Sequence, residues 1–243
     1  AMGNQALYLS TGGSNSAFGA QALVNTTTGF NNTAFGEGTL STNVSGNSNT
    51  AIGIASGTNA AALSNTSALG GGTTTTADNQ IRVGNFNVTS IGGAVNWTAL
   101  SDGRVKKNIK QNVPGLAFIN KLQPVTYNFD LDAADKIIQR PEIKDKDGKV
   151  VPPSSAEIEA RKQKEQVVYT GFVAQDVETA AKSLNYDFSG VDAAKNSKDL
   201  YGLRYSDFVV PLVKAVQELS AKNDAQQKMK EDRPKQIDTP EER

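Results

Sequence analysis

The chain contains no cysteine and no histidine among its 243 residues. Without Cys there is no disulfide framework, although the cellular compartment stays open. Without His or Cys, the Ser-His-Asp and Cys-His arrangements that activate a nucleophile are excluded. The remaining strong candidate for a base beside a serine is lysine, because burial favours its neutral amine.

Long apolar runs are also missing, and none approaches the ~20 residues that a membrane span needs. The 25 Lys and Arg residues balance the 25 Asp and Glu residues, without a basic stripe of the kind that binds nucleic acid. We find no phosphate loop, nucleotide fingerprint or cluster of metal ligands, so we expect no nucleic acid partner, no cofactor and no metal. Ala1-Met2-Gly3 is interpreted as a cloning remnant that does not belong to the fold.

Charge is scarce in the first part of the chain. Residues 1–100 contain only three of the 50 charged residues, namely Glu37, Asp78 and Arg82. A compositional change this sharp indicates a domain boundary at Leu100-Ser101.

Residues 14–76 contain a repeat whose anchor is a small residue, a large apolar residue and a glycine. Successive anchors are 17 residues apart, and Asn, Thr or Ser precedes each one. The four anchors are Ala17-Phe18-Gly19, Ala34-Phe35-Gly36, Ala51-Ile52-Gly53 and Ala68-Leu69-Gly70. A fixed short period is typical of a solenoid or stacked array. The alternative is a disordered Gly/Ser/Thr/Asn linker, against which the strict period argues.

Each repeat offers one or two large apolar groups, which is little against the entropy of ordering 17 residues at roughly 1–2 kcal/mol each. We therefore expect partner chains. Three copies around an axis would give one residue per repeat a shared interior, namely Phe18, Phe35, Ile52 and Leu69.

Residues 79–100 are predicted to form a β-rich neck. Segments 79–84 and 85–91 alternate like short strands, and Gly92-Gly93 is a turn. Trp97 is the only tryptophan and is predicted to be a packed core residue of this neck, with a carbohydrate-stacking surface as the alternative.

From residue 101 onward the pattern predicts an α+β domain. Pro114 suits the first turn of a short helix, and the alternation over 125–131 predicts a strand. The charged insert 132–166 is predicted to hold a turn and a helix over about 156–166. Asp145 and Asp147 have a spacing that calcium sites use, but no further ligands follow, so we interpret this turn as a solvated hairpin.

Further elements are predicted downstream. Strands are expected at 167–169, 186–191 and 200–205, and a helix at about 173–183. The last helix is predicted over about 206–230 with Ser206 as its N-cap. Its apolar positions have 3-4-3 spacing, which predicts a short coiled-coil seam of Val209, Leu212, Val216 and Leu219.

Polar Asn223 and Gln226 occupy the next two seam positions. A helix that merely covers its own domain is the alternative to a coiled coil. The tail 232–243, with Pro234 and Pro240, is predicted to fray.

The boundary stretch Ser101-Asp102-x-Arg104-x-Lys106-x-Asn108-Ile109 resembles the opening motif of the intramolecular chaperone of endosialidase-type tailspikes, the S74 self-cleaving peptidase family. Further blocks resemble the family in the same order: Leu122 to Tyr127, Tyr169 to Val177, and Tyr205 to Leu219. The resemblance implies a Ser-Lys dyad of Ser101 and Lys106 that cuts the Leu100-Ser101 bond. Lys107 is the second choice for the base.

Asp102, Arg104 and Asn108 carry over only as motif residues. Asp102 could orient either Lys106 or Arg104, and the oxyanion donors stay unassigned. If the chain is a self-cleaving peptidase, we expect Arg104, Lys106 and Lys107 to be buried around Ser101. If the domain is a cap without chemistry, we expect them to be solvated.

The repeats resemble the heads of trimeric autotransporter adhesins, although their usual spacing is somewhat shorter. Together, the resemblances imply a multidomain homotrimer with an all-β repeat stalk (1–78), a neck (79–100), an α+β chaperone domain (101–231) ending in a long helix, and a tail (232–243). The expected role is to align three chains so that the stalk folds in register.

The expected setting is extracellular, on a bacterial surface or on a phage or tail-like fibre. The chain's partners would be its own copies and an unknown cell-surface ligand bound by another part of the fibre. The alternative is a structural or adhesive trimer whose C-terminal domain remains as a permanent cap.

Overall fold

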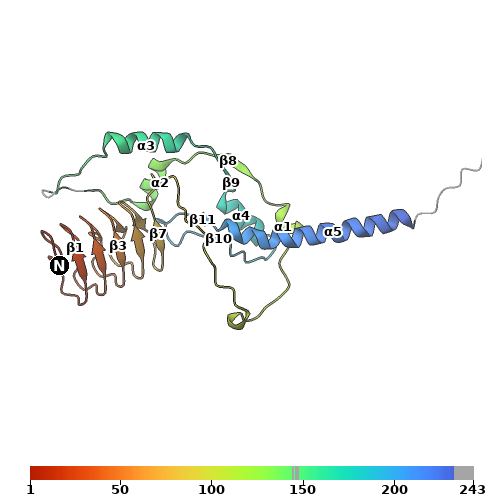
Figure 1. Cartoon of the computed structure of the whole chain (residues 1–243), viewed down its shortest axis with the longest axis horizontal. Coiled ribbons are helices and arrows are strands. Elements are labelled where there is room, and N and C mark those ends of the chain that lie inside the picture. Colours follow the sequence, from red (N-terminus) through yellow and green to blue (C-terminus); the bar gives the residue numbers. More distant parts are fainter. Residues whose placement is uncertain (144, 146–147, 233–243) are drawn as a thin grey trace, which may run out of the picture. The chain divides into compact units, whose positions relative to one another are not determined.

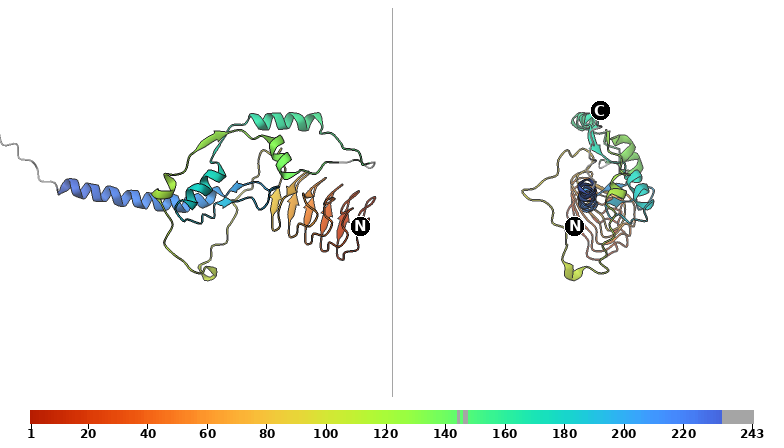
Figure 2. Two further views of the ribbon diagram at one scale, coloured as in Figure 1. Left: turned by 180° about the vertical axis from the view of Figure 1, so that it is seen from behind. Right: turned by 90° about the vertical axis from the view of Figure 1, so that its right-hand side faces the viewer.

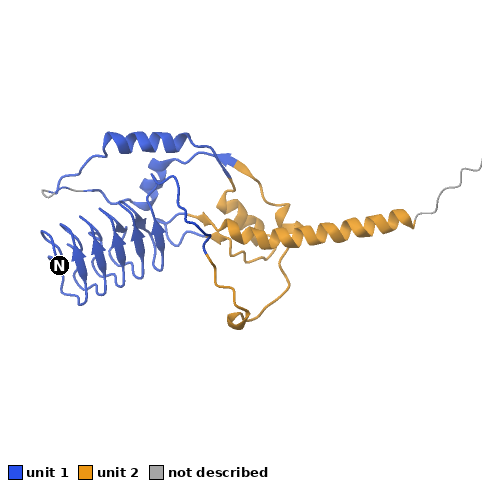
Figure 3. Cartoon of the chain, in the orientation of Figure 1, with its two compact units in different colours: residues 1–97, 126–170, 193–200 blue, residues 98–125, 171–192, 201–243 orange. Residues whose placement is uncertain are grey.

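The computed structural model describes residues 1–143, 145 and 148–232. The described chain forms two compact units, and each contains more than one segment of the sequence (Figure 3). Unit 1 comprises residues 1–97, 126–170 and 193–200, and unit 2 comprises residues 98–125, 171–192 and 201–243. The predicted domain boundaries stay a prediction. Asp147 of the predicted hairpin and nearly all of the tail, 233–243, lie outside the described residues.

Residues 1–84 form a β-solenoid-like stack of short parallel strands (Figure 1). The main sheet has the order β1-β2-β3-β5-β7, and Figure 2 shows the same stack from behind. Its strands are β1 (Ser16–Phe18), β2 (Thr33–Phe35), β3 (Thr50–Ile52), β5 (Ser67–Leu69) and β7 (Ile81–Val83). A second, two-stranded parallel sheet pairs β4 (Gly57–Thr58) with β6 (Thr74–Thr75).

The predicted 17-residue period is confirmed by the strand register. Ala17 pairs with Ala34, Ala34 with Ala51, and Ala51 with Ala68. The stack extends beyond the predicted repeat at both ends. Met2, within the presumed cloning remnant, makes a parallel bridge to Phe18. At the other end β7, predicted to be a strand of the neck, pairs with β5 after a shorter, 14-residue coil in which Ser67 faces Ile81.

The interior of the solenoid consists of apolar residues, most of them alanines, and of a line of buried polar residues. The anchor alanines are buried together with Leu23 and Leu40. Beside them runs an asparagine ladder: Oδ1 of Asn15 accepts from the backbone N–H of Asn32, and Oδ1 of Asn32 accepts from that of Asn49. The ladder pairs buried backbone groups that would otherwise lack partners.

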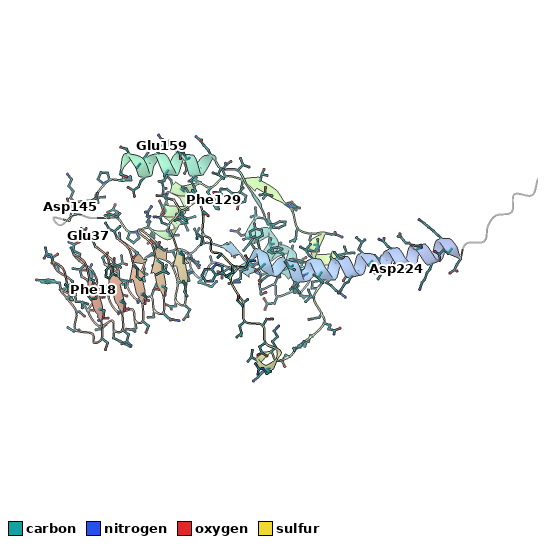
Figure 4. All side chains as sticks on the ribbon, in the orientation of Figure 1. Phe18, Glu37, Phe129, Asp145, Glu159 and Asp224 are labelled. Atoms are coloured by element: carbon teal, nitrogen blue, oxygen red, sulfur yellow. The ribbon has the colours of Figure 1, made fainter. Side chains whose placement is uncertain are left out.

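The large apolar residue of each repeat lies on the opposite face from these alanines, because successive strand residues point to opposite sides. Phe18, Phe35 and Ile52 are exposed, and Leu69 is half-buried. The rings of Phe18 and Phe35 contact each other at 5.8 Å between centroids (Figure 4 labels Phe18). These residues therefore form an outer apolar row and do not contribute to the interior of the single chain.

Each anchor glycine permits the coils to approach closely. Gly19 and Gly36 both have φ +132°, and a Cβ atom on Gly19 would lie 2.5 Å from the backbone of Gly36. Only glycine adopts this conformation without strain and leaves this space free.

The rest of unit 1 carries two helices, α2 (Leu131–Ile138) and α3 (Ser155–Gln166). The predicted strand over 125–131 is too long: β8 is Val125–Tyr127, and the side chain of Asp130 then caps α2 by accepting from the backbone N–H of Ala133. The predicted helix at 156–166 is confirmed as α3. Its N-terminus carries a capping box, which is formed by Ser154 and Glu157.

Unit 2 contains an aromatic core. Phe118, Phe188 and Phe208 lie together with Val177, and the ring centroids of Phe118 and Phe188 are 5.0 Å apart. The core is supplied by residues of α1 (Leu116–Ile119), α4 (Ala174–Lys182), β10 (Val191–Asp192), β11 (Gly202–Leu203) and η2 (Tyr205–Phe208), together with connecting segments. Helix α5 (Val209–Glu231) continues from η2. Strand β9 (Tyr169–Gly171) pairs with β8.

The long C-terminal helix α5 is confirmed, but its predicted N-cap is wrong. The chain enters α5 through the 3-10 turn η2, so Ser206 lies within that turn and makes no cap hydrogen bond. Helix α5 packs near α1, where a carboxylate oxygen of Glu218 accepts from the backbone N–H of Leu116 at 2.8 Å.

Four other expectations fail in whole or in part. The segment 85–91 contains no strand, the strand expected over 186–191 is limited to β10, and that expected over 200–205 is limited to β11. Trp97 is 91% exposed and is not a packed core residue of the chain. The segment from residue 89 to 100 is exposed throughout and has no regular secondary structure, so it offers no neighbours for that ring to pack against.

Candidate functional site

The candidate site is a short turn at the start of the predicted chaperone domain. Residues Gly103–Val105 form the 3-10 helix η1, which brings the chain back so that residues 101 and 106 lie side by side. Nζ of Lys106 donates a hydrogen bond to Oγ of Ser101 at 2.8 Å. The structure thus brings together the two residues that the motif pairs.

Asp102 is the N-cap of this turn. Its carboxylate accepts from the backbone N–H of Arg104 at 2.9 Å and from the Arg104 guanidinium through Nε and a terminal nitrogen. The side-chain bonds from Arg104, and then its backbone N–H, hold the pKa of Asp102 below its ordinary value. The same contact raises the pKa of Arg104. Of the two partners considered for Asp102, the structure therefore provides Arg104, whereas Lys106 contacts the serine.

Asn108 follows the turn in the left-handed conformation, with φ +54°. Asn tolerates this region better than most residues, so its place in the motif has a backbone reason. Among the residues that the structure describes, it is Lys106 and not Lys107 that makes a hydrogen bond to Ser101, so Lys106 is the better-placed base.

The whole turn is open to solvent in the single chain. Ser101, Arg104, Lys106 and Lys107 are all exposed, as is the preceding Leu100. This is the state expected for a domain without chemistry.

Other kinds of site receive little support from the described residues. Within 1–143, 145 and 148–232, no helix is long and apolar enough to cross a membrane, and no group of three or more acidic side chains gathers as metal ligands would. A small cavity of about 90 Å³ in unit 1 is lined by Arg82, Arg140 and Asp199, among others, and includes none of the motif residues.

Sequence reasoning missed Asp199. Its side chain is only 3% exposed, and it accepts hydrogen bonds from Thr76 and Gln80 of the solenoid. No local sequence pattern marks these contacts, because Thr76 and Gln80 are more than 100 positions away from Asp199.

The comparison with known proteins bears on the same turn. No curated protein and no solved structure matches the chain. Residues 101–186 match the family described as Peptidase_S74, chaperone of endosialidase. The match begins at Ser101 itself and includes the Ser101–Lys106 turn, whereas the block from Tyr205 to Leu219 lies beyond it. The segment that follows the β-solenoid is thus similar to the S74 chaperone of endosialidase.

Proposed function

We propose that the chain is the C-terminal end of a homotrimeric fibre whose chaperone domain assists the folding of the β-solenoid and then cuts the Leu100-Ser101 bond. The observation that carries the proposal is the 2.8 Å contact between Ser101 and Lys106 at the first residue of the family match, directly after a solenoid. The family description supports a role in folding or trimerisation of the stalk.

The solenoid is expected to fold slowly without a domain that assists it. Its strands contain two or three residues each, and the coils are held by contacts between neighbouring repeats. Registering three such chains is slow, because the entropy of bringing distant segments together is lost before the contacts form. A C-terminal domain that gathers three chains would raise their effective concentration.

Two exposed apolar surfaces support the trimer. One is the outer apolar row of the solenoid, where Phe35 is 58% exposed. The other is the seam of α5, whose members are between 46% and 66% exposed. The members of this seam are Val209, Leu212, Val216 and Leu219. An exposed row of apolar residues at regular spacing favours packing against another copy, because the copy presents apolar residues at the same spacing.

The proposed reaction is a single cut. Oγ of Ser101 attacks the carbonyl carbon of Leu100 while Lys106 accepts the hydroxyl proton. The Leu100 C–N bond breaks, the proton passes to the released amine of Ser101, and an ester joins the two residues. Water then hydrolyses the ester to a Leu100 carboxylate and restores the serine hydroxyl. Lys106 must be neutral to act, which requires removal of water from the turn. We attribute that step to packing of the turn against other copies in the trimer.

The competing function is a trimer in which the domain remains as a permanent cap. The solvent exposure of Ser101 and Lys106 in the single chain favours it. Under either function we place the fibre outside the cell, on a bacterial surface or on a phage or tail-like particle. Its solenoid would resemble trimeric autotransporter heads, and another part of the fibre would bind a cell-surface ligand.

Intact mass under denaturing conditions separates the two functions. The chain and its Ser101→Ala variant are each measured after expression and long incubation. Masses for 1–100 and 101–243 in the parent alone would support self-cleavage at Leu100-Ser101. Full-length mass in both would reject the peptidase and leave the permanent cap. Cleavage in both would show that Ser101 is not the nucleophile.

A further inference from the structure

The segment 193–200 follows Ser101 in the sequence, yet it belongs to the same compact unit as the solenoid (Figure 3). Residues 126–170 share this position. A cut at Leu100-Ser101 would therefore pass between two parts of the chain that pack together within unit 1.

The centre of this contact is Asp199. Its carboxylate accepts from Oγ1 of Thr76 at 2.5 Å and from Nε2 of Gln80 at 3.2 Å, and the guanidinium of Arg82 lies 3.9 Å away. The other carboxylate oxygen accepts from the backbone N–H of Lys195 at 3.0 Å, which shapes the loop around it. We call Thr76, Gln80 and Asp199 the Asp199 cluster.

The cluster is buried and its polar groups are paired. Gln80 in turn accepts at Oε1 from the backbone N–H of Thr76, so the two solenoid residues of the cluster are also bonded to each other. Burial raises the pKa of the Asp199 carboxyl, but the hydrogen bonds from Thr76, Lys195 and Gln80 outweigh it, and the net pKa is lowered. The carboxylate is thus held as an anion whose hydrogen bonds are of the stronger, charge-assisted kind.

Further bonds join the same two parts of the chain. Nδ2 of Asn196 donates to the backbone carbonyl of Thr76 at 2.8 Å, and Nδ2 of Asn59 donates to the carbonyl of Ile138 at 2.8 Å. Nζ of Lys164, on α3, donates to the carbonyl of Val88. These bonds are spread over α2, α3 and the segment 193–200, so the contact does not depend on one residue alone.

We propose that the Asp199 cluster holds residues 1–100 and 101–243 together without a covalent bond, so that the two pieces remain associated after a cut at the junction. For the natural cut this rests on the proposed function. The association itself does not, because the buried contacts exist in the uncut chain. Cleavage would then free a chain end without releasing the domain.

The test uses the full chain with an engineered cut. A site for a specific protease is inserted between Thr98 and Ala99, where residues 89–100 are exposed, in a Ser101→Ala background that removes any self-cleavage. After complete digestion, checked by denaturing mass, size-exclusion chromatography over a dilution series reports whether the two pieces elute together. Failure of the proposed self-cleavage would not affect this measurement.

The variants are Asp199→Ala and Thr76→Val, with Asp187→Asn, an exposed Asp in unit 2, as the matched control. We expect the parent and the control to elute as one complex. We expect both cluster variants to need about tenfold or higher concentration to remain together, since a lost charge-assisted hydrogen bond corresponds to about that change. Circular dichroism of the uncut variants checks that they fold.

Separation of the parent pieces at all concentrations would overturn the proposal. So would co-elution of both folded cluster variants at the same concentrations as the parent, because the association would then reside elsewhere. If Asp199→Ala fails to fold, Thr76→Val, which removes one hydroxyl at nearly constant volume, decides the outcome alone.

Discussion

Nζ of Lys106 lies 2.8 Å from Oγ of Ser101 and donates to it, although both side chains are exposed. The turn η1 preforms this geometry through the Asp102–Arg104 contact, before any partner covers it. The arrangement therefore brings together the two groups of the proposed dyad, while both stay exposed to solvent in the single chain. Two substitutions test this turn, one at Lys106 and one at Arg104.

Replacement of Lys106 by Gln is expected to slow the cut by roughly 10²–10⁴-fold, the usual contribution of a positioned general base. Gln can still donate to Oγ but cannot accept its proton. The matched control is Lys107→Gln, which changes the same charge one position away. Intact mass over time measures both. Equal slowing in the two variants would contradict the assignment of Lys106 as the base.

Replacement of Arg104 by Gln tests the turn. It removes the guanidinium contact to Asp102, which raises the pKa of Asp102 toward its ordinary value. Because that carboxylate also caps η1 through the backbone N–H of Arg104, we expect the turn to persist and the cut to slow by less than in Lys106→Gln. Cleavage as slow as in Lys106→Gln would show that Arg104 acts on the reaction itself.

The buried side chain of Asn32 is expected to stabilise the solenoid. It is fully buried, donates from Nδ2 to the carbonyl of Gly46 at 2.8 Å and accepts the backbone N–H of Asn49 at 3.0 Å. Asn32→Ala leaves the backbone N–H of Asn49 without a partner, whereas the carbonyl of Gly46 keeps its hydrogen bond from Nδ2 of Asn43. We therefore expect a loss of about 1–3 kcal/mol, the cost of one unsatisfied buried group. Thermal or denaturant unfolding measures this loss.

The control is Asn25→Ala. Asn25 is exposed and makes one bond to the carbonyl of Ser41, so we expect a change within about 0.5 kcal/mol. Similar losses for the two variants would show that the ladder adds nothing beyond an ordinary surface bond.

The stacking of the repeats could be predicted from the sequence, but their orientation could not. A 17-residue period states that Ala17, Ala34 and Ala51 lie above one another, and the register confirms it. The same period applies equally to Phe18 and Phe35. The period does not state which member of each pair faces inward. In the structure the alanines are buried, whereas Phe18 and Phe35 are exposed.

The sequence alone could not show which distant segments pack together in unit 1. The contact of Thr76 with Asp199 joins residues 123 positions apart, in segments without a shared period. The prediction for Trp97 was wrong because it rested on residue type. Large aromatic side chains are usually buried, but the segment around Trp97 is exposed and provides no residues that cover the ring. The proximity of Ser101 and Lys106 was predicted from the resemblance alone, since a five-residue spacing does not fix a turn.

The association of the two pieces through Asp199 is expected to depend on pH in the acid range only. The pKa of Asp199 is lower in the folded chain than in an unfolded one, so the stabilisation is fully present above the ordinary carboxyl value of about 4 and is lost as the pH falls through the folded value. Arg82, Asp135 and Arg140 line the adjacent cavity, and the two arginines stay charged throughout.

Chromatography of the cut chain at stepwise lower pH measures this dependence. In the parent we expect no change between about pH 7 and pH 5 and separation below about pH 4. The Asp199→Asn variant, which cannot ionise, should show a weaker association with little change over that acid range. Separation of the parent near pH 6 would contradict the lowered pKa.

The outer apolar row should decide the oligomeric state. Phe35→Asp places a charge in the middle of this row, on the face away from the buried Ala34, so the single chain should keep its fold. If three copies pack through the row, the buried charge is costly and the trimer should weaken by at least tenfold in concentration. Asn25→Asp, an exposed change outside the row, is the control. Light scattering coupled to size exclusion measures the mass. An unchanged trimer in Phe35→Asp would show that the row faces solvent and that the copies meet through another surface, for which the seam of α5 is the candidate.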